Sequence, residues 1–422
     1  TMTFKKQESI LIVTHDLTLN RVFTSRYFSF ISTLKAEGHN VKGIGIDFAF
    51  KPHPINNMDK VACPVAIESD IITIRPKKLN FVQQMLRFSD HKKLPFFLKK
   101  YLLALHIIIY RTDQWVVNVN DFAELKKYRP TIVIAGGSGG IAETAFKLAK
   151  QYGAKLFIDY RDPWNFGYHP MQTNKLITTF KKRFTINREL LLLSSADEII
   201  TVSTSLKSFF PNSFQKKITV IENGSDYEQE EALDVSLRRP KSYSIVYLGT
   251  LYDDQLVDDS FFESLRIFIK KTNLAPKDLS LSFLGSSENR QLPEILQKFG
   301  LTNFSRITTR LPKADLKLEI DAASLFLQLR HGGRTKVITS KQADYLMFRK
   351  PILLPNSDHG DIAQSIFEHS AGYVCDGKTE TIISVLQKEY NKYLKGDDMR
   401  LAQTDLSHLS RKRLAEKLLA VI

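Results

Sequence analysis

The sequence predicts an α/β protein made of two Rossmann-like parallel-sheet domains. Short apolar runs alternate with amphipathic stretches from residue 10 to residue 223, and the same alternation restarts at residue 244. Between the two series, the segment EQEEALDVSLRRPK is charged and holds no apolar run that could form a buried strand. Strands separated by helices favour a parallel, doubly wound sheet, and the charged break favours a linker between two such domains.

In the first half, six apolar runs are predicted as buried strands, and three stretches with helical spacing of apolar residues are predicted as helices. The strands cover residues 10–13, 41–46, 131–135, 155–160, 198–202 and 217–223. The helices cover residues 26–37, 141–152 and 189–195, and Gly38 closes the first of them.

The second half repeats the pattern with four strands and three helices. The strands cover residues 244–249, 279–285, 323–329 and 351–355, and the helices cover residues 259–271, 292–299 and 340–348. The last 20 residues hold leucines at mixed three- and four-residue spacing, which predicts an amphipathic helix (Leu406, Leu409, Leu414, Leu418 and Leu419). We therefore expect domains at residues 1–226 and 227–402, followed by a helical tail at residues 403–422.

Composition excludes several classes of protein. Apolar residues make up 43% of the 422 residues, which is typical of a globular chain rather than a disordered one. The two cysteines, Cys63 and Cys375, form neither a disulfide framework nor a zinc-ligand spacing, which favours a reducing, cytoplasmic compartment. The longest apolar run, residues 101–110, is too short to span a bilayer, and the start of the sequence lacks the apolar core of a signal peptide.

A glycine loop, residues 136–140 (GGSGG), lies between a predicted strand and a predicted helix. Gly137, Gly139 and Ala142 match the G-x-G-x-x-A pattern of dinucleotide sites, and Asp159 ends the next strand. The fingerprint usually follows the first strand of its sheet, whereas strands and helices precede it here. Two interpretations of the glycine loop therefore remain: a nicotinamide or flavin site, and a simple tight turn.

A third interpretation of the glycine loop is that a ligand approaches the backbone N–H groups of Ser138, Gly139 and Gly140 at the start of the helix. The loop also imitates the G-x-S-x-G turn of hydrolases, with Ser138 as nucleophile, but no spacing identifies a partner histidine.

The segment DYRDPW, residues 159–164, ends the next predicted strand. Arg161, Asp162 and Trp164 therefore lie at the edge of the sheet where open α/β sheets bind ligands. An ion pair between Arg161 and Asp162, with Trp164 packing the loop, is the alternative.

A basic segment precedes the predicted helix at residues 340–348. Arg330, Arg334, Lys336 and Lys341 gather on a glycine-bearing stretch before and at the helix start, which predicts an anion site suited to a diphosphate. Asp344 lies one turn into the helix, where a carboxylate can accept hydrogen bonds from the hydroxyls of a ribose. A solvated basic loop is the alternative.

The acidic pairs of the chain are explained by helix capping, so no metal site is predicted.

Five segments, in this order, resemble GT-B-fold glycosyltransferases of the family-4-like group. They are RDPW (161–164), SSADEIITVSTSLKSFF (194–210), ITVIENGSD (218–226), YLGTL (247–251) and SKQADYLMFRKPIL (340–353). The resemblance covers nearly the whole chain. It implies an acceptor-binding N-terminal domain and a nucleotide-sugar-binding C-terminal domain that face each other across a cleft, with the last helix returning to the N-terminal domain.

The resemblance also implies an activity: a hexosyltransferase that takes a sugar from a nucleotide-diphosphate sugar, with retention, without a metal and with no cofactor beyond that co-substrate. Gly249, Thr250, Asp344 and Tyr345 fall in matched motifs, so we expect them to bind the donor together with the four basic residues above. His15, Asp16 and Asp162 are expected to orient the acceptor hydroxyl. The glycine-loop residues, with Arg161 and Trp164, are expected to line the acceptor side of the cleft.

Two departures accompany the resemblance. The family has another acidic position eight residues before the one that Asp344 matches, and Lys336 occupies it here. The Arg and Lys that usually follow the first strand of the donor domain are also missing, because the segment there is GTLYDDQ. The basic residues at 330–341 are a hypothetical source of the missing charge. A catalytically silent GT-B scaffold is the alternative.

The net charge of +15 is uneven along the chain. Residues 1–222 hold 32 basic and 18 acidic side chains, while residues 223–422 hold 28 and 27. Residues 75–129 and a cluster at 175–188 (Lys175, Lys181, Lys182, Arg183 and Arg188) are rich in basic residues, and the first of these also contains aromatic residues. This pattern favours docking on an anionic membrane, where a lipid-linked acceptor of polysaccharide synthesis lies, at the inner face of the membrane. Nucleic acid is the weaker alternative, because no recognised nucleic-acid module is present.

Overall fold

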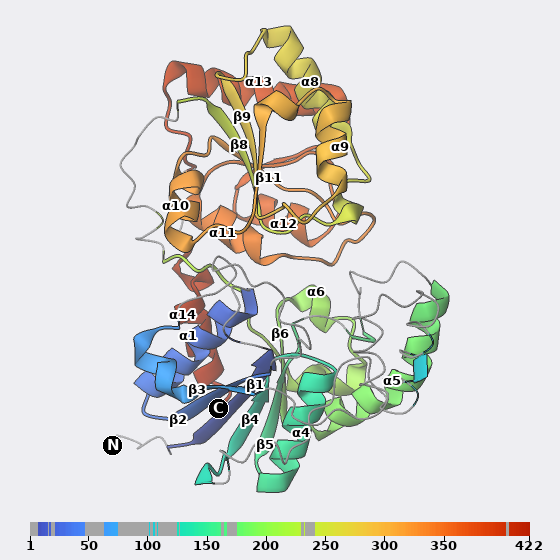
Figure 1. Cartoon of the computed structure of the whole chain (residues 1–422), viewed down its shortest axis with the longest axis vertical. Coiled ribbons are helices and arrows are strands. Elements are labelled where there is room, and N and C mark those ends of the chain that lie inside the picture. The colour runs from blue at the N-terminus through green and yellow to red at the C-terminus, as the bar shows by residue number, and fades with distance from the viewer. Residues whose placement is uncertain are drawn as a thin grey trace, which may run out of the picture. The chain divides into compact units, whose positions relative to one another are not determined.

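The computed structural model describes residues 7–15, 17, 22–46, 63–74, 101, 104–105, 108, 125, 127–161, 164–166, 175–228, 232, 241–401 and 405–422. The chain folds into two compact units (Figure 1). The first unit comprises Thr1–Glu222 together with Leu414–Ile422, and the second comprises Asn223–Arg413. The sequence placed the corresponding boundaries after residues 226 and 402.

The first unit is built on a seven-stranded parallel sheet with the order β3-β2-β1-β4-β5-β6-β7. Its strands are β1 (Ser9–His15), β2 (Asn40–Ile46), β3 (Ile71–Ile74), β4 (Ile132–Ala135), β5 (Lys155–Asp159), β6 (Glu198–Thr201) and β7 (Ile218–Val220). In the register, Ile10 of β1 lies opposite both Val41 of β2 and Ile132 of β4. The continuous apolar runs of β1 and β4 are explained by this place at the centre of a sheet that is covered on both faces.

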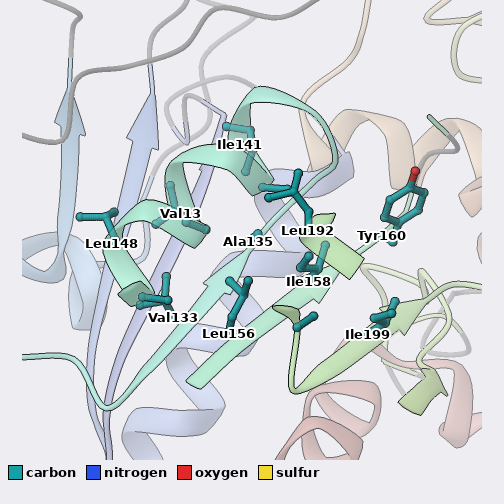
Figure 2. Close-up of a cluster of buried hydrophobic side chains, with 14 of the residues drawn as sticks. Val13, Val133, Ala135, Ile141, Leu148, Leu156, Ile158, Tyr160, Leu192 and Ile199 are labelled. Carbon is teal, nitrogen blue, oxygen red and sulfur yellow. The ribbon is translucent and has the colours of Figure 1, made fainter. Parts of the chain in front are cut away.

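Helices cover both faces of this sheet. Among the described residues they include α1 (Val22–Ala36), α4 (Gly140–Tyr152), α5 (Lys175–Ser195) and α6 (Thr204–Lys207), with 3-10 turns η2 (Val65–Asp70) and η5 (Asn212–Lys217). On one face, α4 and α5 bury side chains such as Ile141 and Leu192 against Val133 and Leu156 of the sheet (Figure 2). On the other face, α1 packs its apolar residues against Ile10 and Ile12.

The second unit is built on a six-stranded parallel sheet with the order β10-β9-β8-β11-β12-β13. Its strands are β8 (Tyr243–Leu248), β9 (Leu279–Leu284), β10 (Ser305–Thr308), β11 (Leu325–Leu327), β12 (Ile352–Leu354) and β13 (Gly372–Val374). Its helices are α8 (Ser260–Thr272), α9 (Gln291–Lys298), α10 (Lys313–Asp321), α11 (Ser340–Phe348), α12 (Asp361–Glu368) and α13 (Thr379–Lys395), with 3-10 turns η6 (Asp253–Gln255), η7 (Thr302–Phe304) and η8 (Ser407–Leu409).

Two separate cores lie on the two faces of the second sheet. Side chains of α8, α9 and α13 pack on one face, and side chains of α10, α11 and α12 pack on the other. The alternation along β11 shows this division, because Leu325 and Leu327 enter the first core and Phe326 enters the second. The predicted α/β class with two Rossmann-like parallel sheets is therefore confirmed.

The predicted helix over the last 20 residues is wrong in its extent. The helix, α14, spans only Arg411–Leu419 and follows η8. Leu406 and Leu409 belong to the core of the second unit, whereas Leu414 and Leu418 are buried in the first unit against the α1 face of its sheet. The leucines serve two different cores, so they do not form one face of one helix.

Other helices and strands differ in extent from the predictions. The helix predicted at residues 189–195 begins at Lys175, and the strand predicted at residues 323–329 is limited to Leu325–Leu327. Most of the predicted linker, residues 227–241, and most of the basic segment, residues 75–129, lie outside the described residues. Within the described ranges, no helix combines the length and the apolar character that a bilayer span requires.

Candidate functional site

The second unit presents two neighbouring strand ends where its strand order reverses. β8 and β11 pair in parallel although they are not consecutive, so the chain connections leave in opposite directions from this point. Open α/β sheets bind ligands at the carboxyl ends of such strands. Gly249 directly follows β8, and Gln328 directly follows β11.

Two glycines let the backbone pack closely at this edge. Gly249 has a φ of 83° and Gly285, after β9, has a φ of 93°, a left-handed conformation that other residues adopt only with strain. A Cβ atom on Gly285 would lie 3.3 Å from the Cα of Gly249. Ser286 donates a hydrogen bond of 2.8 Å from Oγ to the carbonyl of Gly249. The loops after β8 and β9 are therefore fixed to each other.

Lys341, the second residue of α11, lies beside Gly249. Its Cε is 3.9 Å from the position that a Cβ on Gly249 would take. Its Nζ donates a hydrogen bond to the hydroxyl of Tyr247 and lies 3.8 Å from the centre of that ring. Burial, together with the positive charge of Arg310, lowers the pKa of Lys341 to about 7. The lysine is thus a desolvated cation that pairs with a neutral hydroxyl and an aromatic face.

Arg310, which follows β10, brings a second cation to the same strand end. Its Nη2 donates to Oγ1 of Thr250 at 3.2 Å. Lys341 from the first turn of α11 and Arg310 from the loop after β10 therefore converge on Gly249 and Thr250. Sequence reasoning missed Arg310, because the short strand before it carries no continuous apolar run.

Two of the four basic residues predicted for the anion site are paired with carboxylates. Nη2 of Arg330 lies 3.3 Å from Oδ2 of Asp258, and Nη2 of Arg334 lies 3.6 Å from Oδ2 of Asp254. Both acids belong to the loop at residues 249–259, called the acidic loop here. Lys336 is exposed on the basic loop, residues 330–339. The acidic loop thus neutralises part of the basic loop.

Gln255 holds the acidic loop in place. This buried side chain accepts a hydrogen bond of 3.0 Å from the hydroxyl of Tyr247, and its Nε2 donates to the carbonyl of Leu329 at 2.9 Å. The same tyrosine hydroxyl receives the hydrogen bond of Lys341. One chain of hydrogen bonds therefore positions Lys341, the acidic loop and the end of β11.

Asp344 lies one turn along α11 from Lys341. Its Oδ1 accepts a hydrogen bond of 2.6 Å from Oγ of Ser225. Burial raises the pKa of Asp344 to about 7, although the Ser225 hydrogen bond and the charge of Lys313 oppose this rise. A carboxyl group that changes its protonation state near neutral pH can donate or accept a hydrogen bond with a ligand hydroxyl.

Tyr345, which the sequence placed at the donor, supports the site from beneath. Its side chain is fully buried and stacks on Phe326 with 4.4 Å between ring centres. Its hydroxyl accepts from the backbone N–H of Leu248 at 2.9 Å and donates to the carbonyl of Leu327 at 3.0 Å. Tyr345 therefore joins the ends of β8 and β11 and has no remaining surface for a ligand.

His331, on the basic loop, is a residue that sequence reasoning missed. Only 4% of its surface is exposed, and Nε2 is buried without a hydrogen-bond partner. Nδ1 lies 3.8 Å from Oδ2 of Asp254. Burial, followed by the charges of Lys341 and Arg334, lowers the pKa of this histidine to about 3. The structure thus places a neutral imidazole among cations.

In the first unit, the predicted acceptor residues follow adjacent strands. His15 is the last residue of β1, Ser138 and the glycines 139 and 140 follow β4, and Arg161 and Trp164 follow β5. These three strands are neighbours in the sheet, so their carboxyl ends share one edge. Asp16 and Asp162, the other two candidates for orienting the acceptor, lie outside the described residues.

The glycine loop is fixed by close packing against α1. A Cβ atom on Gly136 would lie 2.6 Å from Cζ of Tyr27 and 2.8 Å from Cβ of Thr14. Gly137 and Gly139 have φ values of 147° and 60°. Trp164, beyond the next strand, is buried in the core, and its backbone N–H donates to the hydroxyl of Tyr160 at 3.2 Å.

Asp159, the acid that a dinucleotide site would use to bind a ribose, already accepts hydrogen bonds from other side chains. Asp159 is fully buried and accepts hydrogen bonds of 2.8 and 3.1 Å from Arg26, and one of 2.9 Å from Tyr27. Glu143 lies in the first turn of α4, paired with Arg188 at 2.7 Å, where a carboxylate repels a phosphate. Both features speak against a nicotinamide or flavin at the glycine loop. Within the described part of the chain, no three His, Cys, Asp or Glu residues gather as metal ligands.

No protein-family model and no curated protein matches this sequence. Solved structures match along nearly the whole chain. Staphylococcus aureus TarM, solved with Fondaparinux, alpha-GlcNAc-glycerol and UDP, has a TM-score of 0.61 at 10% identity, with 99% of each chain covered. Sucrose-phosphate synthase from Thermosynechococcus elongatus has a TM-score of 0.59 at 11% identity, covering 99% of this chain and 98% of that one.

An enzyme of another class shares the fold. The UDP-GlcNAc 2-epimerase from Methanocaldococcus jannaschii has a TM-score of 0.54 at 10% identity, with 98% of each chain covered. These matches show that the chain has the GT-B fold, which confirms the fold that the sequence motifs implied.

Proposed function

We propose that the protein is a glycosyltransferase that moves a sugar from a nucleoside-diphosphate sugar to a glycan or lipid-linked acceptor. The observation that carries this proposal is the pair of cations, Lys341 and Arg310, at the carboxyl end of β8 and beside the N-terminus of α11. Proteins of the same fold that are named for UDP-GlcNAc or solved with UDP support a nucleotide sugar as the substrate.

The chemistry follows from the charge that the reaction creates. Breaking the bond between the sugar and the diphosphate leaves negative charge on the departing nucleotide, and preorganised cations and helix N-termini stabilise that charge. Lys341, Arg310 and the first turn of α11 supply these groups in our proposal. Asp344, one turn along the same helix, then faces the hydroxyls of the ribose.

In this proposal the transfer retains the configuration of the sugar and needs neither a metal nor a cofactor besides the nucleotide sugar. The two side-chain cations take the role that a metal ion plays at a diphosphate. The departing phosphate accepts the proton of the acceptor hydroxyl, so no protein nucleophile is required.

The first unit binds the acceptor in this proposal. His15, Asp16 and Asp162 orient the attacking hydroxyl, while Ser138, Gly139, Gly140, Arg161 and Trp164 line the acceptor side. The shared sheet edge of β1, β4 and β5 supports this assignment for the described residues. The excess of basic residues over 1–222 supports contact with an anionic membrane at its cytoplasmic face, in polysaccharide synthesis. Sedimentation with anionic liposomes tests that contact.

A thermal-shift screen of UDP-, GDP-, ADP- and CMP-sugars tests the donor. A donor at 100 times its dissociation constant adds about 2.7 kcal/mol of stability to the unit that binds it. Analysis of the products in the presence of acceptors then separates glycosyl transfer from epimerisation and from a silent scaffold.

The decisive variant is Lys341→Ala. We expect calorimetry to show nucleotide binding weakened about tenfold or more, because a hydrogen bond to a charged group contributes about 1.5–3 kcal/mol. Lys277→Ala removes an exposed lysine of the same unit and serves as the control. An affinity that Lys341→Ala leaves unchanged contradicts the proposed donor site.

A further inference from the structure

His331 is a buried polar side chain with an unused ring nitrogen. Its Nε2 has no hydrogen-bond partner, although 96% of the residue is shielded from solvent, given its 4% exposed fraction. Polar atoms buried in proteins are nearly always hydrogen-bonded, since an unsatisfied one is destabilising. A nitrogen left unpaired at the edge of a binding site therefore points to a ligand group.

The other nitrogen of the ring decides what kind of group that is. Nδ1 lies 3.8 Å from Oδ2 of Asp254, which is beyond hydrogen-bond distance, and the negative charge of that carboxylate favours the tautomer that carries hydrogen on the nearer nitrogen. Nε2 is then the nitrogen with the lone pair. It can accept a hydrogen bond, but it has no hydrogen to donate.

The imidazole also stays neutral when an anion binds. Burial and the charges of Lys341 and Arg334 lower its pKa to about 3. A nearby opposite charge raises a pKa by about 1 to 3, which is not enough to protonate His331 at neutral pH. An ionised phosphate offers only acceptors, so it cannot satisfy Nε2. The matching group is a hydrogen-bond donor such as a hydroxyl.

The position of His331 indicates which hydroxyl this is. The ring of His331 lies 5.9 Å, between ring centres, from that of Tyr252, and Gly332, the next residue, lies against Asp254. Both neighbours belong to the acidic loop, which begins at Gly249 and Thr250 beside the cations that we assign to the diphosphate. The sugar is bonded directly to that diphosphate, while the ribose hydroxyls are assigned to Asp344.

We propose that His331 binds the sugar of the donor, through a hydrogen bond that Nε2 accepts from a sugar hydroxyl. The inference rests on the proposed function and deepens it, since it names a residue that distinguishes a nucleotide sugar from the free nucleotide. Asp254 is the positioning residue whose charge favours the required tautomer.

Two variants separate the two ring nitrogens. His331→Asn keeps a polar atom near Asp254 and removes the group at Nε2, whereas His331→Gln places an amide near Nε2. Calorimetry measures the dissociation constants of the nucleotide sugar that gives the largest thermal shift, and of its parent nucleoside diphosphate. We expect His331→Asn to weaken the nucleotide sugar by about 5- to 100-fold, which corresponds to the loss of one buried hydrogen bond. We expect His331→Asn to change the dissociation constant of the free nucleotide by no more than about twofold. His331→Gln should bind the nucleotide sugar almost as tightly as the unaltered protein.

His359→Asn makes the same change at an exposed histidine of this unit and should alter neither constant. Equal weakening of both ligands by His331→Asn indicates a structural or ribose-binding role and overturns the inference, as does an unchanged affinity for the nucleotide sugar. If the unaltered protein binds neither ligand, the proposed function itself is contradicted and the inference falls with it.

A deoxy series identifies the hydroxyl. The donor analogue that lacks the hydroxyl bound by His331 should lose little further affinity in His331→Asn, because the two changes remove the same hydrogen bond. Additive losses for every deoxy position contradict a direct contact.

Discussion

Lys341 is a lysine that the fold desolvates, and no carboxylate among the described residues pairs with it. Its ammonium group contacts the hydroxyl and ring of Tyr247, while Arg310 adds a repelling charge. Nearby, Arg330 and Arg334 are each paired with an acid of the acidic loop. The fold therefore places Lys341 and Arg310 together at the end of β8, where a bound diphosphate would stabilise the ammonium form of Lys341.

This arrangement predicts that nucleotide binding depends on pH. Only the protonated lysine attracts a diphosphate, and burial has lowered its pKa to about 7, so above that pH binding must be accompanied by proton uptake. We expect the affinity to fall by up to about tenfold per pH unit between about pH 7.5 and 9.5, where the phosphates are already ionised. Calorimetry across this range measures the slope.

Lys341→Arg is the control for this prediction, because arginine stays charged throughout the range. The variant should bind nucleotide with a much flatter pH dependence. A slope that is the same in both proteins would show that another group titrates.

At the scale of helices, strands and their loops, the site depends on contacts between loops that follow different strands. The loops after β8 and β9 touch through glycine backbone, and Gly285 has a φ of 93° with only a tight space of 3.3 Å for a Cβ atom against the Cα of Gly249. The α11 segment brings Lys341 to the same place. A change in one loop therefore moves the other.

Gly285→Ala tests this coupling. The left-handed conformation is strained for alanine, and the added methyl group makes a tight contact of 3.3 Å with the backbone of Gly249, so we expect a loss of about 1–3 kcal/mol in the free energy of unfolding of the second unit. Nucleotide affinity should fall as well. Chemical denaturation and calorimetry measure the two effects. Gly333→Ala adds a methyl group with nothing within 4 Å and should change stability little.

The strands that sequence reasoning missed share one property. β3, β10 and β13 lie at sheet edges, and their residues are only partly buried. An edge strand has one partner and needs no continuous apolar run, so its hydrophobic pattern is weak. Arg310 follows one of these strands, and for this reason half of the cation pair could not be predicted.

At the scale of the whole molecule, the chain builds its first core from both of its ends. Leu414, Ala415 and Leu418 are buried with Ile10 and Ile12 of the first strand. Leu406 and Leu409, just before them in the chain, pack in the core of the second unit. The last 20 residues therefore contribute first to the core of the second unit and then to that of the first.

Leu418→Ala should destabilise the first unit and leave the second unchanged. Truncating a buried leucine removes apolar contacts and leaves a cavity, at a loss of about 2–5 kcal/mol. Scanning calorimetry with and without nucleotide identifies the units, since the nucleotide raises only the transition of the unit that binds it. We expect Leu418→Ala to lower the melting temperature of the transition that the nucleotide does not raise, which is that of the first unit.

Lys417→Ala is the matched change on the exposed side of the same helix. It breaks a solvent-exposed ion pair with Glu222, which contributes about 0–1 kcal/mol at most. A destabilisation by Lys417→Ala as large as that by Leu418→Ala would contradict the assignment of Leu418 to the core.

The sequence by itself determined the two parallel sheets, because buried central strands and amphipathic helices are local patterns. It also determined the start of α11 and the place of Lys341 and Asp344 on it, since both lie in one short motif. Only the tertiary structure decided how the charges pair. Arg330 and Arg334 pair with acids of another loop, and Arg310, which follows a third strand, donates to Thr250. His331 is buried by the residues that pack around it. These interactions depend on distances between segments far apart in the chain, and no local pattern encodes such distances.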